Sequence, residues 1–356
     1  SVDLSRDDDL DAITAAIAGA EKTTDLIESL AVWLSRWRDD FTIAGIGHRI
    51  VHGGTLYGGP AIAHEDVLAK LDAFSVFAPA HQPYNLSGVR ALKRALPDVT
   101  QTLSFDTAFH RTMPRIAELY ALPRAFSDDG ILRFGFHGLS YAHIADTLPS
   151  LHGDMPKRVV ALHLGSGASA CAMLNGKSIA TSMGLTALDG LPMATRCGDL
   201  DPGVVLHLIQ DRGLSADTVA DLLYKRSGLL GVSGQSSDTR VLLESGDEAA
   251  LEAIDLYCYR IAREAGSLAI ALGGLDAIVF SGGVGENAPE IRQRIVRQLE
   301  CLGAGIDADA NAQNETLLSQ NEIAVPAYRI VADEERVIAR ECAGLVTAFE
   351  QHPRIA

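Results

Sequence analysis

The sequence lacks any apolar run that approaches the roughly 20 residues needed to cross a bilayer, and its first residues show no signal-peptide pattern. Cysteine is scarce. The five thiols are scattered, odd in number and without CxxC spacing: Cys171, Cys197, Cys258, Cys301 and Cys342. This pattern argues against a disulfide framework or a zinc site, and it fits reduced thiols in a cytoplasm.

Positive charge is also in short supply. The chain holds 30 Lys and Arg against 46 Asp and Glu, a formal net charge of −16. This balance argues against nucleic acid and acidic membrane surfaces as partners. A site for an anionic substrate must concentrate positive charge locally, so Arg and His residues beside glycine turns are the candidates for such a site.

What the chain does have is the composition of a folded protein. Hydrophobic residues make up 47% and charged residues 21%, which is typical of globular rather than disordered chains. Its 356 residues exceed a single domain of roughly 100–200 residues, so two domains are expected.

The stretch Arg158–Met173 is the most informative. Val159–Leu164 is an aliphatic run typical of a buried strand, Gly165-Ser166-Gly167 is typical of a tight turn, and small residues follow. This pattern predicts a β-hairpin. Because glycine has no Cβ, backbone N–H groups at the tip can approach an anion closely, with His163 and Ser166 as side-chain donors. The alternative is an ordinary hairpin whose glycines serve only the turn.

Arg49 interrupts an apolar strand expected over residues 43–51, just before the glycine pair Gly53-Gly54. A charge in such a strand needs a partner. One reading is an Arg that binds the carboxylate or phosphate of a ligand in two-pronged fashion. The other is an Arg paired with a core carboxylate.

Four more ionisable side chains lie at turns or strand ends. His81 lies in a proline-bracketed turn, Asp106 at the carboxyl end of an expected strand, His137 between an aromatic residue and a glycine, and Arg196 in a glycine-rich passage. Ligands of α/β sheets gather at the carboxyl ends of strands. Taken singly, Asp106 also fits a helix cap, and His137 fits a core histidine.

A second glycine signature, Gly282–Asn287, follows a strand and precedes a helix. Backbone N–H groups in such a turn suit the phosphates of a nucleotide. Gly283–Ala288 also matches the G-x-G-x-x-A form of a dinucleotide fingerprint, which leaves an NAD-dependent oxidoreductase as an alternative. The segment Gly228–Arg240 is predicted to be a binding loop, and Asp333-Glu334-Glu335 reads as an acidic helix start.

The remaining periodicities predict the framework. Helices are expected over residues 3–38, 86–96, 140–148, 202–212, 248–272 and about 336–350, and strands over 99–105 and 324–332.

Seven segments, in one order along the chain, together resemble the acetate kinase family of short-chain carboxylate kinases, which share the actin, sugar-kinase and Hsp70 fold. They are His48–Gly54, Phe105–His110, Phe136–Gly138, His163–Gly167, Thr195–Gly198, Ser236–Arg240 and Gly282–Asn287. The resemblance implies an α/β fold of two related ribonuclease-H-like domains with the active site in the cleft between them. It implies residues 1–107 plus 336–356 as an acyl and phosphate-side domain, and residues 108–335 as a nucleotide-binding domain.

The implied reaction is reversible, Mg²⁺-dependent (or Mn²⁺-dependent) phosphoryl transfer from ATP to acetate, giving acetyl phosphate and ADP by direct in-line transfer. Such an enzyme works by positioning and neutralising charge. The resemblance also implies a homodimer.

The resemblance assigns each site residue a role. Arg196 and His137 face the transferred phosphoryl group, Arg49 holds the carboxylate, and His81, Val51 and Phe136 surround the acyl group. The nucleotide is assigned to His163, Leu164, Gly165, Ser166, Gly167, Asp238, Thr239, Arg240, Gly283, Val284, Gly285, Glu286 and Asn287.

Asp106 matches the family's active-site aspartate, and Glu334 or its neighbour Glu335 matches the family's metal carboxylate. A carboxylic acid of pKa about 4 has no proton to lose at neutral pH, so orienting Mg²⁺ or its waters suits Asp106 better than general-base catalysis.

Three departures from the family pattern stand out. The family's first phosphate loop, of the type Asn-x-Gly-Ser-Ser-Ser-x-Lys, does not occur here; either a preceding segment is omitted, which we favour, or part of the site is lacking. Ser166 replaces the family's usual Asn. Ala80 and Ala187 replace larger residues, which predicts an acyl pocket that also admits propionate. Propionate and butyrate kinases, and a nucleotide-binding module without catalysis, are the remaining alternatives.

Overall fold

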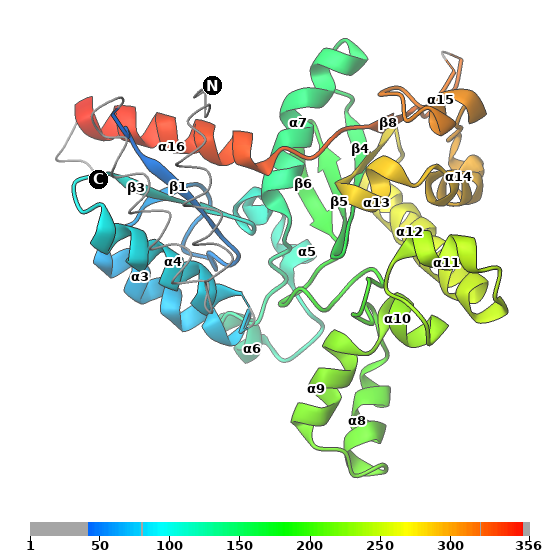
Figure 1. The fold of residues 1–356 in the computed structure, drawn as a ribbon, viewed down its shortest axis with the longest axis horizontal. Helices are drawn as coiled ribbons and strands as arrows, with labels where there is room; N and C mark the ends of the chain where they lie inside the picture. Colours follow the sequence, from blue (N-terminus) through cyan, green and yellow to red (C-terminus); the bar gives the residue numbers. More distant parts are fainter. Residues whose placement is uncertain (1–41, 80, 321, 352–356) are drawn as a thin grey trace, which may run out of the picture. The chain divides into compact units, whose positions relative to one another are not determined.

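The computed structural model describes residues 42–79, 81–320 and 322–351, and the helices expected over residues 3–38 lie outside them. The described chain forms two compact units. The first consists of residues up to Ala108 together with those from Glu335 onward, and the second is Phe109–Glu334. In Figure 1 the first unit is blue to cyan with a red helix, and the second runs from cyan through green and yellow to orange.

The first unit is built on a three-stranded sheet in the order β1-β3-β2. β1 (Ile46–Ile50) is parallel to β3 (Gln101–Phe105), and β2 (Ala61–Ile62) is antiparallel to it. Its core joins strand residues such as Ile50 and Phe105 to α3 (Glu65–Asp72) and α4 (Gln82–Ala95). α4 starts four residues earlier than its periodicity indicates.

The opposite side of β1 is covered by α16 (Glu334–Gln351), as Figure 1 shows. A Cβ added to Gly47 would lie 2.5 Å from Cγ2 of Ile338, and one added to Gly45 would lie 2.6 Å from Cγ2 of Val346. These two glycines therefore allow the helix to approach the strand backbone closely.

The second unit contains a five-stranded sheet in the order β6-β5-β4-β7-β8. Its strands are β4 (Arg158–Leu164), β5 (Ala168–Leu174), β6 (Lys177–Thr181), β7 (Ala277–Ser281) and β8 (Ala327–Arg329). β4, β5 and β6 are antiparallel neighbours, whereas β7 and β8 continue the sheet parallel to β4. The strand expected over 324–332 is thus only three residues long.

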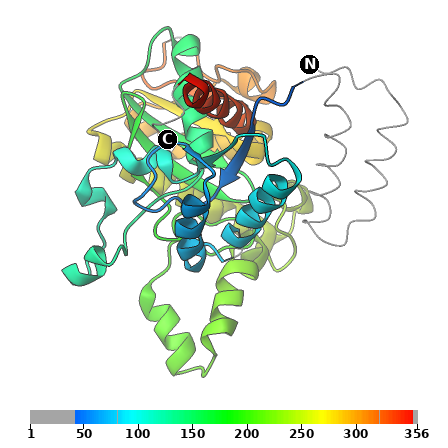
Figure 2. The same cartoon turned by 90° about the vertical axis from the view of Figure 1, so that its left-hand side faces the viewer.

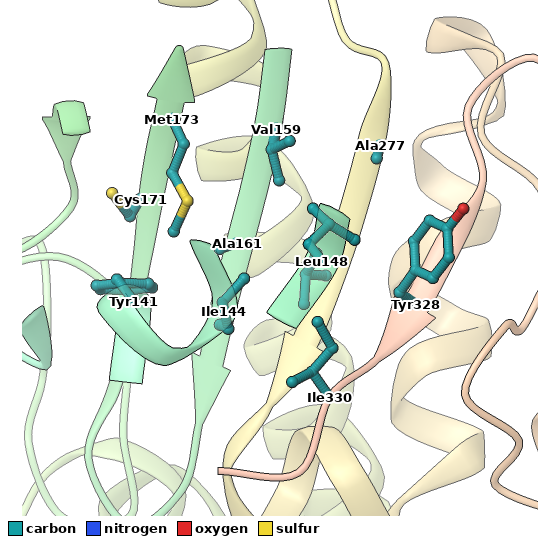
Figure 3. Close-up of a cluster of buried hydrophobic side chains, with 11 residues drawn as sticks. Tyr141, Ile144, Leu148, Val159, Ala161, Cys171, Met173, Ala277, Tyr328 and Ile330 are labelled. Atoms are coloured by element: carbon teal, nitrogen blue, oxygen red, sulfur yellow. The ribbon is translucent and has the colours of Figure 1, made fainter. Parts of the chain in front are cut away.

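One face of this sheet packs against α7 (Gly138–His152), which contributes Tyr141, Ile144 and Leu148 to the buried cluster in Figure 3. Because strand side chains alternate between faces, the intervening residues face the other way. There α12 (Glu248–Leu272), whose bounds match the prediction, packs against β4, β5 and β6. The α/β class predicted from the sequence is confirmed.

Shorter elements complete the two units. They are η1 (Ala73–Val76), η2 (Ala108–Thr112), α5 (Arg115–Glu118), α6 (Arg124–Asp128), α8 (Pro202–Gln210), α9 (Ala216–Lys225), α10 (Gly228–Ser233), α11 (Thr239–Ser245), α13 (Gly282–Asn287), α14 (Pro289–Gln298), η3 (Glu300–Leu302) and α15 (Ala308–Ala312). α8 and α9 project from the second unit's sheet in both Figure 1 and Figure 2. None of the helices in the described ranges is long and apolar enough to span a membrane.

Two sequence predictions are corrected here. The segment predicted as a loop from Gly228 contains α10, because the backbone carbonyls of Met193 and Ala194 accept hydrogen bonds from the first N–H groups of that helix. Residues 282–287 form α13 rather than an open turn. Gly282 alone has a positive φ (77°), and a Cβ there would lie 2.8 Å from the Leu164 carbonyl oxygen.

Candidate active site

The hairpin predicted at Arg158–Met173 is confirmed. β4 and β5 pair in antiparallel register through His163 opposite Ser169 and Leu164 opposite Ala168. The turn is closed by a hydrogen bond from Gly165 N to Gly167 O of 2.9 Å. A Cβ added to Gly167 would lie 2.8 Å from Nη2 of Arg196 and 3.3 Å from Nε2 of His137. The two cations or donors predicted from the sequence therefore lie at the hairpin tip, against a backbone without a side chain.

His137 reaches this tip from an unusual backbone position. It is the residue before α7 and has a left-handed conformation, φ 57° and ψ 24°, which is uncommon outside glycine. Its ring stacks on that of His163, with centroids 4.3 Å apart. Nδ1 of His137 bonds Oγ of Ser169 at 2.8 Å, and Nδ1 of His163 bonds Oγ of Ser140 at 2.8 Å. The strained backbone is thus fixed by several contacts, as is common at functional sites.

Arg196 is partly buried, and no carboxylate of the described residues pairs with it. Within the described ranges, its guanidinium makes one hydrogen bond, from Nη1 to the Ala187 carbonyl at 2.7 Å, and no ion pair. Burial lowers the pKa of Arg196 below its ordinary value, although the group stays cationic at neutral pH. A desolvated cation with unfilled donors, facing a glycine turn, is suited to bind an oxyanion.

Beside the hairpin tip lies a cavity of about 530 Å³. Its lining combines three predicted nucleotide segments that are far apart in the sequence. The predicted residues on its wall are Gly165, Ser166, Asp238, Thr239, Arg240, Gly283, Val284 and Asn287. Leu229 and Ser237, which lie in the predicted binding loop Gly228–Arg240, also line the cavity, and Ala194, Tyr257 and Ala288, which had no assigned role, complete the wall.

The remaining predicted nucleotide residues do not line this cavity. Leu164 is fully buried, and Gly285 packs against the Leu164 side chain. Oε1 of Glu286 accepts a hydrogen bond from the backbone N–H of Ala332 at 2.9 Å, which ties α13 to the segment that leads to Glu334. These residues support the wall from behind.

Asp238 and Arg240 form a pair at the cavity. Asp238 caps α11 by accepting from Arg240 N at 2.9 Å, and Nη2 of Arg240 lies 2.6 Å from Oδ2 of Asp238. These hydrogen bonds lower the pKa of Asp238 to about 2. Because the Arg240 side chain is 82% exposed, its outer face remains accessible to a ligand.

Arg292 was not singled out from the sequence, yet it is the largest fully buried side chain. Its five N–H donors make five hydrogen bonds: Nη1 to the carbonyls of Gly285 and Glu286, Nε and Nη2 to Asn311, and Nη2 to Oδ1 of Asn314. All five acceptors are neutral. Burial lowers its pKa to about 10. Arg292 thereby clamps α13, one wall of the cavity.

In the first unit, Arg49 is paired with a core carboxylate, the second reading of the sequence, and that carboxylate is Asp106. Nε of Arg49 donates to Oδ1 at 2.9 Å and Nη2 to Oδ2 at 2.8 Å. The Asp106 side chain is 3% exposed and that of Arg49 41%. Burial raises the pKa of Asp106, while Arg49, and His81 more weakly, oppose the rise.

The other predicted acyl-site residues fall in both units. Val51 follows β1 and donates its backbone N–H to Oδ1 of Asn85 at 3.2 Å. His81 is exposed and precedes α4. Phe136 belongs to the second unit, where it is buried and its carbonyl accepts from Nε2 of His110 at 2.9 Å. Ala80 lies outside the described residues.

The predicted metal carboxylate Glu334 is half-buried at the first position of α16, whereas Glu335 is exposed. The part of the chain that the structure describes contains no cluster of three or more His, Cys, Asp or Glu side chains. Mg²⁺ usually takes one or two protein carboxylates and completes its shell with water and substrate phosphates. A single half-buried carboxylate such as that of Glu334 is a ligand type that an ion of this kind accepts.

Comparison with known proteins agrees with this geometry. Residues 7–340 match the profile described as the Acetokinase family. The chain is 51% identical over 320 residues to an acetate kinase of Rhodopseudomonas palustris strain TIE-1, which covers 89% of this chain and 80% of that protein.

Two solved structures are similar. A propionate kinase from Francisella tularensis superposes with a TM-score of 0.86 at 36% identity, over 91% of this chain and 85% of that one. The acetate kinase of Porphyromonas gingivalis superposes with a TM-score of 0.83 at 36% identity, over 90% of this chain and 84% of that one. With a family profile that covers most of its length and a relative at 51% identity, the chain belongs to the acetokinase family.

Proposed function

We propose that the protein is an acetate kinase, which transfers the γ-phosphoryl group of ATP to acetate and returns it in the reverse direction. The observation that carries the proposal is the hairpin tip, where Arg196 and His137 adjoin Gly167 beside the nucleotide-sized cavity. The bond between the γ-phosphorus and its bridging oxygen breaks as an acetate oxygen bonds to that phosphorus, and ADP leaves.

In this reaction the protein has little covalent chemistry to perform. The Arg196 guanidinium neutralises negative charge on the equatorial phosphoryl oxygens, and His137 donates a hydrogen bond to one of them. Such preorganised donors act most strongly where charge is redistributed in the transition state. The glycine tip lets a phosphate approach the backbone closely.

The nucleotide is proposed to occupy the cavity of about 530 Å³. Asp238, Thr239 and Arg240 hold the adenosine end, and Gly283, Val284 and Asn287 form the opposite wall. A bound Mg²⁺, or Mn²⁺, supplies charge neutralisation on the phosphates. Asp106 and Glu334 would hold that ion or its waters.

Arg49 is proposed to bind the acetate carboxylate through guanidinium N–H groups other than those that bond Asp106. Its 41% exposure supports this role, although the pair with Asp106 occupies Nε and Nη2. His81, Val51 and Phe136 are proposed to surround the methyl group.

The test of the activity is a hydroxamate assay with acetate, MgATP and hydroxylamine, run on the native protein and on Gly167→Ala. The native protein should form acetyl hydroxamate. The added methyl group would press on Arg196 and His137, so turnover should fall about 10- to 100-fold. Gly344→Ala, where a Cβ meets nothing within 4 Å, is the matched control. Binding of MgATP without any hydroxamate would instead support a nucleotide-binding module without catalysis.

Propionate is a second candidate substrate. Ala187, whose carbonyl accepts from Arg196, stands where the family tends to have a larger residue, and a similar structure at 36% identity is a propionate kinase. An added methylene typically changes selectivity by about 10- to 200-fold. A kcat/KM for propionate more than a hundredfold below that for acetate would contradict this extension.

Assembly and location are further proposals. α8 has no buried residue and exposes Val204, Leu206 and Ile209, an apolar surface suited to a homodimer contact. Val204→Glu should shift the sedimentation coefficient from dimer to monomer if α8 forms that contact.

All five cysteines are free thiols, which supports a cytoplasmic location. The charge of −16 supports small anionic substrates rather than nucleic acid or membrane as partners.

A further inference from the structure

We propose that Ser169, backed by Tyr141, is a positioning residue that holds His137 in the tautomer whose proton is on Nε2. The tautomer itself is a property of the free protein. Only its effect on turnover rests on the proposed function.

The three side chains form a continuous hydrogen-bonded row. The Tyr141 hydroxyl lies 2.5 Å from Oγ of Ser169, and Oγ of Ser169 lies 2.8 Å from Nδ1 of His137. Ser169 and Tyr141 are 0% exposed. Figure 3 shows Tyr141 at one side of the buried cluster, near Cys171.

Counting protons along the row fixes the direction of each hydrogen bond. Burial, with a smaller contribution from Cys171, raises the pKa of Tyr141 well above its ordinary value, so the phenol keeps its proton. Within the described ranges, its acceptor is Oγ of Ser169. The Ser169 proton is then left with Nδ1 of His137 as acceptor. A histidine whose Nδ1 accepts carries its proton on Nε2.

The opposite arrangement would leave a buried group unsatisfied. If Nδ1 of His137 carried a proton, Oγ of Ser169 would accept it. Ser169 would then either donate to Tyr141, so that the phenolic proton loses its acceptor, or accept from Tyr141 as well, so that its own proton has no acceptor in this row. An unsatisfied buried polar group destabilises the arrangement that contains it. The row therefore disfavours the Nδ1–H tautomer and the doubly protonated ring alike.

The groups around His137 act in the same direction. His163 from β4 stacks on the ring at 4.3 Å, Arg196 lies at the same hairpin tip, and Tyr141 approaches from α7. If the His137 ring were doubly protonated, its positive charge would face the positive charge of Arg196. The neutral ring instead directs Nε2–H toward Gly167, where the phosphoryl group is proposed to bind.

The direct test is ¹⁵N NMR of the full chain labelled in histidine, with His137→Gln to assign the ring signals. The native protein should show the Nε2–H pattern for His137, and Ser169→Ala should shift it toward a mixture of tautomers. Ser169→Thr, which keeps a hydroxyl, should preserve the native pattern. An Nδ1–H pattern in the native protein would overturn the proposal.

Kinetics give a second, separate readout. Ser169→Ala and Tyr141→Phe should each lower kcat about 10- to 100-fold, with KM for ATP within twofold, because donors are misplaced rather than binding groups lost. The matched control is Ser178→Ala: Oγ of Ser178 bonds Nδ1 of another buried histidine, His110, at 2.9 Å. Its kcat should stay within twofold.

The outcomes separate the two proposals. Equal kcat losses in Ser169→Ala and Ser178→Ala would show a merely structural role and overturn the positioning role. If Ser169→Ala does not fold, Tyr141→Phe provides the same comparison with the hydroxyl of Ser169 retained. An Nε2–H pattern in a native protein that transfers no phosphoryl group would overturn the proposed function and leave the tautomer assignment intact.

Discussion

Arg196 and Arg292 are two desolvated arginines of the same unit, and neither forms an ion pair with a described carboxylate. Arg292 is fully buried, and neutral acceptors fill all five of its donors. Arg196 makes one hydrogen bond, to Ala187, and directs Nη2 to the glycine tip. One guanidinium is satisfied by the fold. The other has donors for which the described residues provide no acceptor, and we propose that an anion fills them.

The two arginines differ in whether their hydrogen-bond donors are filled, and burial alone does not reveal this difference. A buried cation with filled donors holds the structure together, because removing it leaves acceptors unpaired. A desolvated cation with open donors adds little stability and is available for binding. Activity and stability should therefore separate between the two arginines.

The largest expected effect is on turnover. Arg196→Ala should lower kcat about 10³-fold, the loss typical of removing a donor to transition-state charge, and leave the free energy of unfolding within about 0.5 kcal/mol of native. Hydroxamate kinetics and urea denaturation measure the two quantities. The control Arg90→Ala removes an arginine paired with Asp72 at the surface and should change neither much. A large stability loss in Arg196→Ala would break the comparison.

Arg292→Met should show the reverse pattern. Loss of five hydrogen bonds, three of them buried and two partly buried, should reduce the free energy of unfolding by about 3 kcal/mol and weaken MgATP binding through displacement of α13. Arg294→Met, two residues on in α14, removes a partly exposed arginine paired with Glu290 and Asp255, and should lose well under 1 kcal/mol. Equal stability of the two variants would contradict the clamp.

Arg49 is a third arginine for the comparison, because its partner, Asp106, is charged. Arg49→Met leaves the Asp106 carboxylate buried without its cation and should reduce the free energy of unfolding by about 2 kcal/mol, less than for a fully buried pair because Arg49 is 41% exposed. Arg49→Met with Asp106→Asn should recover part of that loss. A double-mutant cycle by urea denaturation measures the coupling, and a coupling near zero would refute the pairing.

The smallest effect concerns His110, a buried histidine whose two ring nitrogens are hydrogen-bonded to Oγ of Ser178 and to the carbonyl of Phe136. Burial lowers the pKa of His110 to about 4, so between that value and about 6.5 the unfolded chain binds one more proton than the native state. Stability is therefore lost as the pH falls, by about 1 kcal/mol from pH 7 to pH 5.5. His110→Gln should remove this increment from the pH dependence of unfolding. An unchanged pH slope would contradict a neutral, buried His110.

Much of the fold follows from local pattern. The hairpin of β4 and β5, the helix α12 and the strands β1 and β3 were predicted because long apolar periodicities and paired glycines are local signals. α10 was missed because its first N–H groups bond to carbonyls of residues 193 and 194, more than 30 positions earlier in the chain. β8 was predicted too long because pairing with β7, not composition, sets its ends.

The candidate site was predictable where a motif marks a residue by type. Arg196, His137 and the glycine tip were identified in this way. The partners that decide what each residue does were not: the sequence left open whether Arg49 had a carboxylate, and gave no sign of Ser169 or Arg292 among ordinary strand and helix residues. Hydrogen-bond partners depend on tertiary contacts, which residue type alone does not reveal.

The packing of α16 on β1 also affects the order in which the two units can finish folding during synthesis. Gly45 and Gly47, near the start of the described chain, are covered by Val346 and Ile338. The described strands of the second unit are all available for pairing once β8 has emerged from the ribosome. One face of the first unit's sheet, in contrast, remains exposed to solvent until α16 has also been made. The first unit, most of which is synthesised first, is therefore the last to finish folding. During translation the sheet face that α16 will cover needs protection from other apolar surfaces.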